Sequence, residues 1–196
     1  MRTSAPHIFA AGDVIGSLML VPPAIQEGFV AATNAVLGAT MPLGDHVNTT
    51  ASFTDPEYAQ AGLTEAKARE THDVVTAVVN FDSTTRTIID GRNAGFCKLI
   101  ADRKTAKILG CHVVGERAVE IAQVAAIAID SGMRVDDLVH VPLAYPTYTG
   151  ILANVAAGVA LQLKMDVGWQ AHKIESAEFG HVPGGAESRP ASMRGN

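Results

Sequence analysis

The chain has 196 residues, of which 47% are hydrophobic, and its formal net charge is −5. This composition suits one ordinary domain with additional segments and excludes a disordered polar tract. The acidic balance, with a pI near 5.8, disfavours a broad basic surface, so no nucleic-acid partner is expected.

The first 40 residues are predicted to form a short strand and a helix. An apolar run ends at Gly12, where the chain is expected to turn. A helix is predicted over Pro23–Leu37, because proline is tolerated in a first turn and Gly38 suits a helix end. Residues 41–48 contain Pro, Gly, Asp and Asn, which is typical of a linker.

Residues 49–163 are predicted to form a self-contained α+β domain. Stretches rich in β-branched side chains predict strands at Ala51–Thr54, Val74–Phe81, Ile88–Ile89, Gly95–Ala101 and Ile108–Val114. Longer apolar stretches predict helices at 116–131 and 147–162, with a short piece at Val135–Leu138 between them. Strands followed by helices favour an antiparallel β-sheet of about five strands with the helices packed on one side.

The last residues, 164–196, differ from the domain in composition. They contain a Gly-Gly pair, two prolines and scattered Ser, Arg and His. We therefore predict a C-terminal tail that is partly disordered, from about His181 onward.

Cysteine content and hydropathy bear on the compartment. Two cysteines in a chain of this length do not make a disulfide framework, so a reducing, cytoplasmic compartment is expected. The N-terminal residues lack the apolar run of a signal peptide. No stretch reaches the roughly 18 apolar residues of a membrane span, so no membrane partner is expected.

A flavin-binding motif is the first chemical signal. Thr3–Val14 resembles the second flavin motif of the pyridine nucleotide-disulfide oxidoreductases, T-x-x-x-x-I-[YF]-A-x-G-D. The resemblance implies that Gly12 lets the backbone approach FAD closely. It also implies that the Asp13 carboxylate accepts hydrogen bonds from the ribityl or pyrophosphate-proximal part of this cofactor.

The same resemblance continues through Leu18–Ala24 and then Glu27 and Gly28. It implies a helix whose positive N-terminal end points at the isoalloxazine ring. The backbone N–H of Val21 would then face the flavin. The candidate cofactor contacts are Gly12, Asp13, Leu20, Val21 and Ala24.

A second motif resembles the dimerisation domain of the same family. Ser52–Glu65 matches F-T-x-P-E-x-A-x-V-G-x-T-E, with Gly62 permitting a tight approach and Thr64 capping a helix. Gly95–Ile100 and Ile108–His112 match G-x-x-K-[LV]-[IV] and I-L-G-x-H. The resemblance implies a homodimer of the FAD/NAD-linked reductase dimerisation-domain type, for which the two long helices are the expected apolar interface.

The third motif is the segment Leu143–Gly150. It resembles the family's catalytic His-Pro-Thr-x-x-Glu, but Tyr145 replaces the histidine and Gly150 replaces the glutamate. Tyrosine has a reference pKa near 10, against about 6.5 for histidine, so Tyr145 is a poor base near neutrality but a good hydrogen-bond donor. Tyr145 and Tyr148 are candidate catalytic phenols, as in the mercuric reductase branch. Packing at an interface is the alternative for both.

Other family features are absent from the sequence. It has no G-x-G-x-x-G loop, no C-x-x-x-x-C pair and no C-terminal Cys-Cys pair. One hypothesis is therefore the last two-fifths of a FAD-dependent NAD(P)H oxidoreductase, mercuric-reductase-like with an unspecified substrate, which alone is inactive and without tightly bound FAD. The alternative is a free-standing dimerisation or interaction module without catalysis.

Cys97 and Cys111 lie on neighbouring predicted strands and are expected to be close. They suggest a redox pair, a metal site together with His112, or two buried small side chains. The last interpretation is favoured, because both are ordinary sheet positions in the resemblance.

Overall fold

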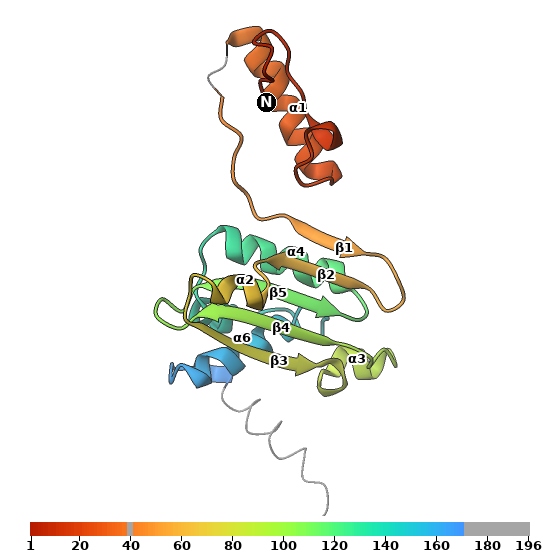
Figure 1. Ribbon diagram of the computed structural model, residues 1–196. Coiled ribbons are helices and arrows are strands. Elements are labelled where there is room, and N and C mark those ends of the chain that lie inside the picture. Colours follow the sequence, from red (N-terminus) through yellow and green to blue (C-terminus); the bar gives the residue numbers. More distant parts are fainter. Residues whose placement is uncertain (39–40, 171–196) are drawn as a thin grey trace, which may run out of the picture.

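A computed structural model describes residues 1–38 and 41–170, which form a five-stranded sheet with helices and a separate N-terminal segment (Figure 1). All strand pairs are antiparallel, in the order β1-β2-β5-β4-β3. The strands are β1 (Thr49–Ser52), β2 (Tyr58–Gly62), β3 (Val74–Asn80), β4 (Phe96–Asp102) and β5 (Ile108–Val114). The predicted α+β fold with an antiparallel sheet of about five strands is confirmed.

The hairpin between β4 and β5 shows how local chemistry sets the register. Asp102 ends β4, and its carboxylate accepts the hydroxyl of Thr105 at 2.7 Å and the Thr105 N–H at 3.2 Å. The Thr105 hydroxyl is the main cause that lowers the pKa of the Asp102 carboxyl. The turn aligns the two strands so that Cys97 pairs with Val113.

Two helices, α4 (Ala118–Asp130) and α6 (Ile151–Gln162), cover one face of the sheet, and α5 (Val135–His140) packs on α6. Alternate strand residues point to this face, and Val75, Leu99 and Val113 are fully buried against the helices. α6 packs closely on β3, because a Cβ at Gly158 would lie only 3.2 Å from the Ala77 Cβ. Small residues therefore set the distance between helix and sheet.

The two long helices are largely covered by the chain itself. Ile127 is the large apolar side chain of α4 that stays exposed, and Leu161 is its counterpart in α6. The sheet and α5 bury most of the apolar surface of both helices, and their role as the dimer interface stays a prediction. A dimer contact on this side would use the remaining half-buried and polar positions.

One predicted strand is wrong, and one observed strand was not predicted. Ile88–Ile89 is not a strand but ends helix α3 (Thr85–Ile89). The helix forms because the Thr84 and Thr87 hydroxyls donate to the carbonyl of Phe81 and close a tight turn after β3. β2 was not predicted as a strand, since its Ala, Gln and Gly residues have weak strand preference and only pairing between β1 and β5 makes it one.

The opposite face of the sheet carries the short helix α2 (Glu65–Arg69). Thr64 caps it as predicted, since its hydroxyl accepts the Lys67 N–H at 3.2 Å. Ala68 of this helix is buried on Val74 and Ile100 in a second, small apolar cluster. α2 therefore covers only part of this face.

The N-terminal segment contains a 3₁₀ turn, η1 (Gly12–Ile15), and helix α1 (Val21–Leu37). Figure 1 shows this segment standing apart from the sheet domain, beyond β1. The connecting chain touches the domain through Asp130, which accepts the Val47 N–H at 2.9 Å and contacts the His46 ring at 3.2 Å. One side of α1 exposes apolar side chains, among them Ile25 and Phe29.

The chain after α6 still belongs to the core. Val167 is buried against it, and a 3₁₀ turn, η3, covers Gly168–Gln170. The predicted disorder from His181 lies outside the described residues. Within residues 1–38 and 41–170, no helix combines the length and apolarity that crossing a membrane requires.

Candidate functional site

The loop of residues 141–150 connects α5 to α6 and contains both candidate phenols. The Thr147 hydroxyl donates to the carbonyl of Ala144 at 2.7 Å and accepts the Gly150 N–H at 3.2 Å. These bonds fold the loop back on itself at the start of α6. The Tyr145–Pro146 peptide bond is cis.

Tyr148 is tied to the domain by its ring and its hydroxyl. The ring lies 6.5 Å from that of Phe81, centroid to centroid. The hydroxyl donates to Oδ2 of Asp90 at 2.8 Å. Burial, followed by this bond to a carboxylate, raises the pKa of Tyr148 to about 12. Tyr148 is therefore protonated at neutral pH and acts as a hydrogen-bond donor rather than a base.

Asp90 receives a second bond at the same oxygen, from Nε of Arg86 at 2.8 Å. The bond from Tyr148 first, and that from Arg86 second, lower the pKa of the Asp90 carboxyl. Arg86 lies in α3 and Asp90 directly follows it. The partner of Tyr148 is thus an ionised carboxylate of the same chain, so this phenol has a structural contact within the domain.

Tyr145 is placed differently. Its side chain is 71% exposed, and its hydroxyl lies 2.7 Å from Oγ1 of Thr85 in α3. Both phenols therefore contact the same region, α3 and the residue after it. Of the two phenols, Tyr145 is the one whose ring is exposed to solvent and accessible to a second molecule.

Gly150 leaves Tyr145 without the orienting carboxylate of the family motif. Its φ is −56°, a conformation that any residue adopts, and a Cβ there would lie 3.2 Å from the carbonyl of Thr147. The backbone therefore does not require glycine. A glutamate at this position would need only a small adjustment of the loop.

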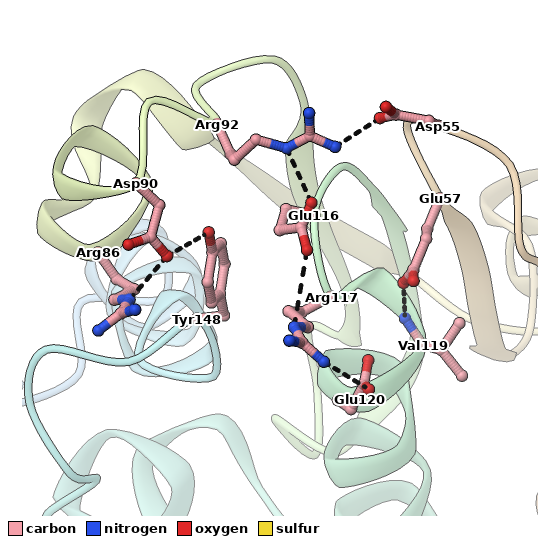
Figure 2. Close-up of polar contacts among 10 residues, drawn as sticks. All are labelled: Asp55, Glu57, Arg86, Asp90, Arg92, Glu116, Arg117, Val119, Glu120 and Tyr148. Carbon is pink, nitrogen blue, oxygen red and sulfur yellow. Dashed lines mark hydrogen bonds and ion pairs between the residues drawn. The ribbon is translucent and has the colours of Figure 1, made fainter.

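A network of ion pairs lies beside Tyr148 (Figure 2). Arg92 bonds Asp55 at 2.6 Å and Glu116 at 2.8 Å, and Glu116, then Asp55, raise the pKa of this guanidinium. Asp55 belongs to the β1–β2 turn, Arg92 precedes β4 and Glu116 follows β5. Arg92 thereby joins three turns at one end of the sheet. Arg117 extends the network to Glu116 at 3.6 Å.

An open hollow of about 490 Å³ lies between this network and the loop 141–150. It is lined by three arginines, two acidic residues and the segment Pro146–Tyr148. The sequence did not identify Arg86, Asp90, Arg92 or Glu116. The four-residue spacing of Arg86 and Asp90 is a helical ion-pair signal, but it was hidden by the strand predicted at Ile88–Ile89.

The candidate flavin contacts are gathered in the N-terminal segment. Gly12 has a φ of +76°, which favours glycine, and a Cβ there would face the Ala24 side chain at 3.6 Å. Asp13 is exposed in the first turn of η1. At the start of α1 two prolines follow Val21, so its N–H is the only amide among those first three helical residues.

Within one chain, the candidate flavin contacts and the candidate phenols lie apart from each other. Figure 1 shows α1 beyond β1, whereas α3, which contacts both phenols, lies near the end of β3 at the opposite edge of the sheet. Gly12, Asp13, Leu20, Val21 and Ala24 form one group in the N-terminal segment, and Tyr145 and Tyr148 another in the domain.

The cysteines are close, as expected. The sulfur atoms of Cys97 and Cys111 are 3.8 Å apart, both residues are fully buried, and both thiols are free. The contact with Cys111, together with burial, raises the pKa of the Cys97 thiol well above its usual value. His112 points to the other face, where its ring contacts the carbonyl of Leu63 at 3.2 Å. In the described part of the chain, no group of three His, Cys, Asp or Glu side chains is arranged to hold a metal.

Comparison with known proteins agrees with this fold. The chain is 37% identical over 139 residues to a mercuric reductase of Bacillus cereus, an overlap of 70% of this chain and 22% of that protein. It is 36% identical over 161 residues to a dihydrolipoyl dehydrogenase of Mycobacterium bovis, an overlap of 81% and 35%. The chain thus spans about a fifth to a third of the length of these relatives.

Solved structures are also similar. LpdA from Mycobacterium tuberculosis is 26% identical with a TM-score of 0.71, and the match covers 80% of this chain and 34% of that one. The HOCl-induced flavoprotein disulfide reductase RclA from Escherichia coli shares the fold at 22% identity and a TM-score of 0.72, over 79% and 36%. The family model "Pyridine nucleotide-disulphide oxidoreductase, dimerisation domain" matches residues 48–156. The chain therefore belongs to the pyridine nucleotide-disulphide oxidoreductase dimerisation-domain family.

Proposed function

We propose that this chain is the C-terminal dimerisation portion of a FAD-dependent NAD(P)H oxidoreductase of the disulfide reductase family. One observation carries the proposal: the glycine turn at Gly12 and Asp13 precedes a dimerisation fold in the same chain. A module that only dimerises has no use for such a turn. The likeness to mercuric reductase and dihydrolipoyl dehydrogenase supports an oxidoreductase as the parent protein.

The residues of the N-terminal segment fit a flavin. FAD supplies the electron transfer chemistry when bound, and NAD(P)H is the co-substrate of the parent protein. Asp13 offers an exposed carboxylate to the hydroxyls of the cofactor, while the left-handed backbone at Gly12 allows a close approach. The N–H of Val21 at the start of α1, with Leu20 and Ala24 nearby in sequence, would face the ring system of the bound cofactor.

In this proposal the dimer is a homodimer, and Tyr145 acts across it. The exposed phenol donates a hydrogen bond at the redox site of the second subunit, where the family motif has an acid–base histidine. Alone, the chain neither catalyses turnover nor holds FAD tightly, because it matches only 22% and 35% of the length of these two relatives. Its two free, buried thiols suit a reducing compartment, so we place it in the cytoplasm.

Three observations test the proposal. Sedimentation of the purified chain should give a dimer, and its absorbance spectrum should show no flavin. The reading frame upstream of Met1 should encode a Gly-rich nucleotide motif and a C-x-x-x-x-C pair. A dimer with a genuine translation start at Met1 and no such upstream sequence would instead establish the free-standing dimerisation module.

A further inference from the structure

Glu27 is a buried acidic residue in the middle of α1. Its side chain is only 2% exposed, although glutamate is rarely buried unless it is paired. Each carboxylate oxygen accepts one hydrogen bond from the turn that precedes the helix. Oε2 accepts the Gly12 N–H at 2.7 Å, and Oε1 accepts the Ser17 hydroxyl at 2.7 Å.

These two bonds hold both ends of the loop that presents Asp13. Gly12 comes directly before Asp13, and Ser17 lies two residues after the end of the 3₁₀ turn Gly12–Ile15. Two glycines with positive φ, Gly12 and Gly16, give this loop a conformation that needs external support. Glu27 supplies that support from the adjacent helix.

We infer that Glu27 is a positioning residue for the flavin turn: it fixes residues 12–17 so that Asp13 points outward toward the cofactor. Glu27 lies behind the loop and is buried, so it holds the loop without itself reaching a ligand on the exposed side. The inference deepens the proposed function and rests on it for the identity of the ligand. The effect of Glu27 on the loop before binding is testable without a flavin.

The first test is amide hydrogen exchange in the whole 196-residue chain, read on peptides that cover residues 12–17. Loss of hydrogen bonds to a buried carboxylate should raise the exchange rate of these amides by about 10- to 100-fold in Glu27→Ala. Ser17→Ala removes one bond without touching the helix, and Glu27→Gln keeps an acceptor for Gly12. Both should give intermediate rates.

Asn34→Ala is the matched control. Asn34 is also buried on α1, and it bonds the backbone of Met41 through two contacts of 2.8 Å. Its removal should speed exchange near residue 41 and leave residues 12–17 unchanged. Unchanged exchange at 12–17 in both Glu27→Ala and Ser17→Ala would overturn the inference, as would equal acceleration there in the control.

The second test is the flavin-to-protein ratio and FAD affinity of the longer protein that carries the same substitutions. Glu27→Ala should lower the affinity at least about tenfold, as expected for one lost charged hydrogen bond, and Asn34→Ala should not. Full retention of FAD by Glu27→Ala would overturn the role toward the cofactor. A wild-type protein that binds no flavin would instead refute the proposed function, while the exchange result would still decide whether Glu27 fixes the loop.

Discussion

The Tyr148 hydroxyl donates a hydrogen bond of 2.8 Å to Asp90, a residue 58 positions earlier in the chain. With the contact between Tyr145 and Thr85 at 2.7 Å, this bond ties the loop 141–150 to α3 and its C-terminal end. The family's catalytic segment is thus held by a helix that the sequence did not predict. The position of the exposed Tyr145 ring therefore depends on Tyr148, which is the partly buried phenol of the same loop.

Removal of the Tyr148 hydroxyl should destabilise the domain. Tyr148→Phe keeps the ring contact with Phe81 but loses the bond to a charged group, for an expected loss of about 1 kcal/mol in the free energy of unfolding. Urea denaturation at neutral pH measures it. Tyr145→Phe, at a far more exposed side chain, should cost less than about 0.5 kcal/mol. Equal effects of the two variants would contradict this assignment.

The same bond makes stability depend on alkaline pH. The folded pKa of Tyr148 is about 12, above its ordinary value of 10.0, so the folded state retains the proton more tightly. Its contribution is complete below pH 10 and is lost as the pH rises through 12. The stability difference between the wild type and Tyr148→Phe should therefore narrow over this interval. Absorbance titration should show one of the three tyrosines, absent in Tyr148→Phe, ionising last.

Restoring the family dyad should restore acid–base chemistry. In the longer protein, Tyr145→His with Gly150→Glu should speed the reduction of a small disulfide at least about tenfold, since a positioned acid–base group contributes roughly 10²–10⁴. The backbone at Gly150 accepts a side chain, and an acidic residue suits the N-terminal end of α6. Tyr145→His alone should gain less. A double variant no faster than the wild type would show that position 145 does not meet the substrate.

Gly62 should be intolerant of substitution. Its φ is +72°, and a Cβ there would lie 2.3 Å from the carbonyl oxygen of Leu109. Gly62→Ala should therefore lower the free energy of unfolding of the sheet domain by at least about 2 kcal/mol, through backbone strain and the displaced strand. Gly28→Ala is the control, because that helical glycine faces open space. An unchanged denaturation midpoint for Gly62→Ala would disprove the close approach.

The thiols should be inert in the folded chain. Cys97 and Cys111 are fully buried, and the raised pKa of Cys97 keeps the unreactive protonated form. An aromatic disulfide reagent should titrate neither thiol in native buffer and both of them after unfolding in guanidinium chloride. Rapid reaction of either thiol in the native chain would favour the redox-pair interpretation instead.

Periodicity and composition predicted those strands and helices whose local residue preferences agree with the observed structure. Val74–Asn80 and Ile108–Val114 are rich in β-branched side chains and are strands, and the apolar run in α4 is a buried helix. Ile88–Ile89 has the same β-branched signal but lies in α3, because the threonine hydroxyls before it favour a turn. β2 has no such signal and becomes a strand through its two neighbours.

Motif spacing located the candidate sites but not their contacts. The sequence identified Gly12, Asp13, Tyr145 and the glycine at 62, since each belongs to an ordered pattern. Glu27 belongs to the flavin-motif resemblance, but its role was not predicted, because a hydrogen bond between residues 15 positions apart leaves no periodic signal. The Arg92 network was missed for the same reason, since its partners come from three turns far apart in the chain.

The sequence by itself determined the fold class, the family and the replacement of the histidine and glutamate by Tyr145 and Gly150, since these depend on residue type and spacing alone. Only the tertiary structure decided that Tyr148 is a partly buried donor while the ring of Tyr145 is exposed, and that Glu27 lies behind the flavin turn. Burial and hydrogen bonding depend on which distant segments pack together. That information resides in the packed chain and in no local stretch of it.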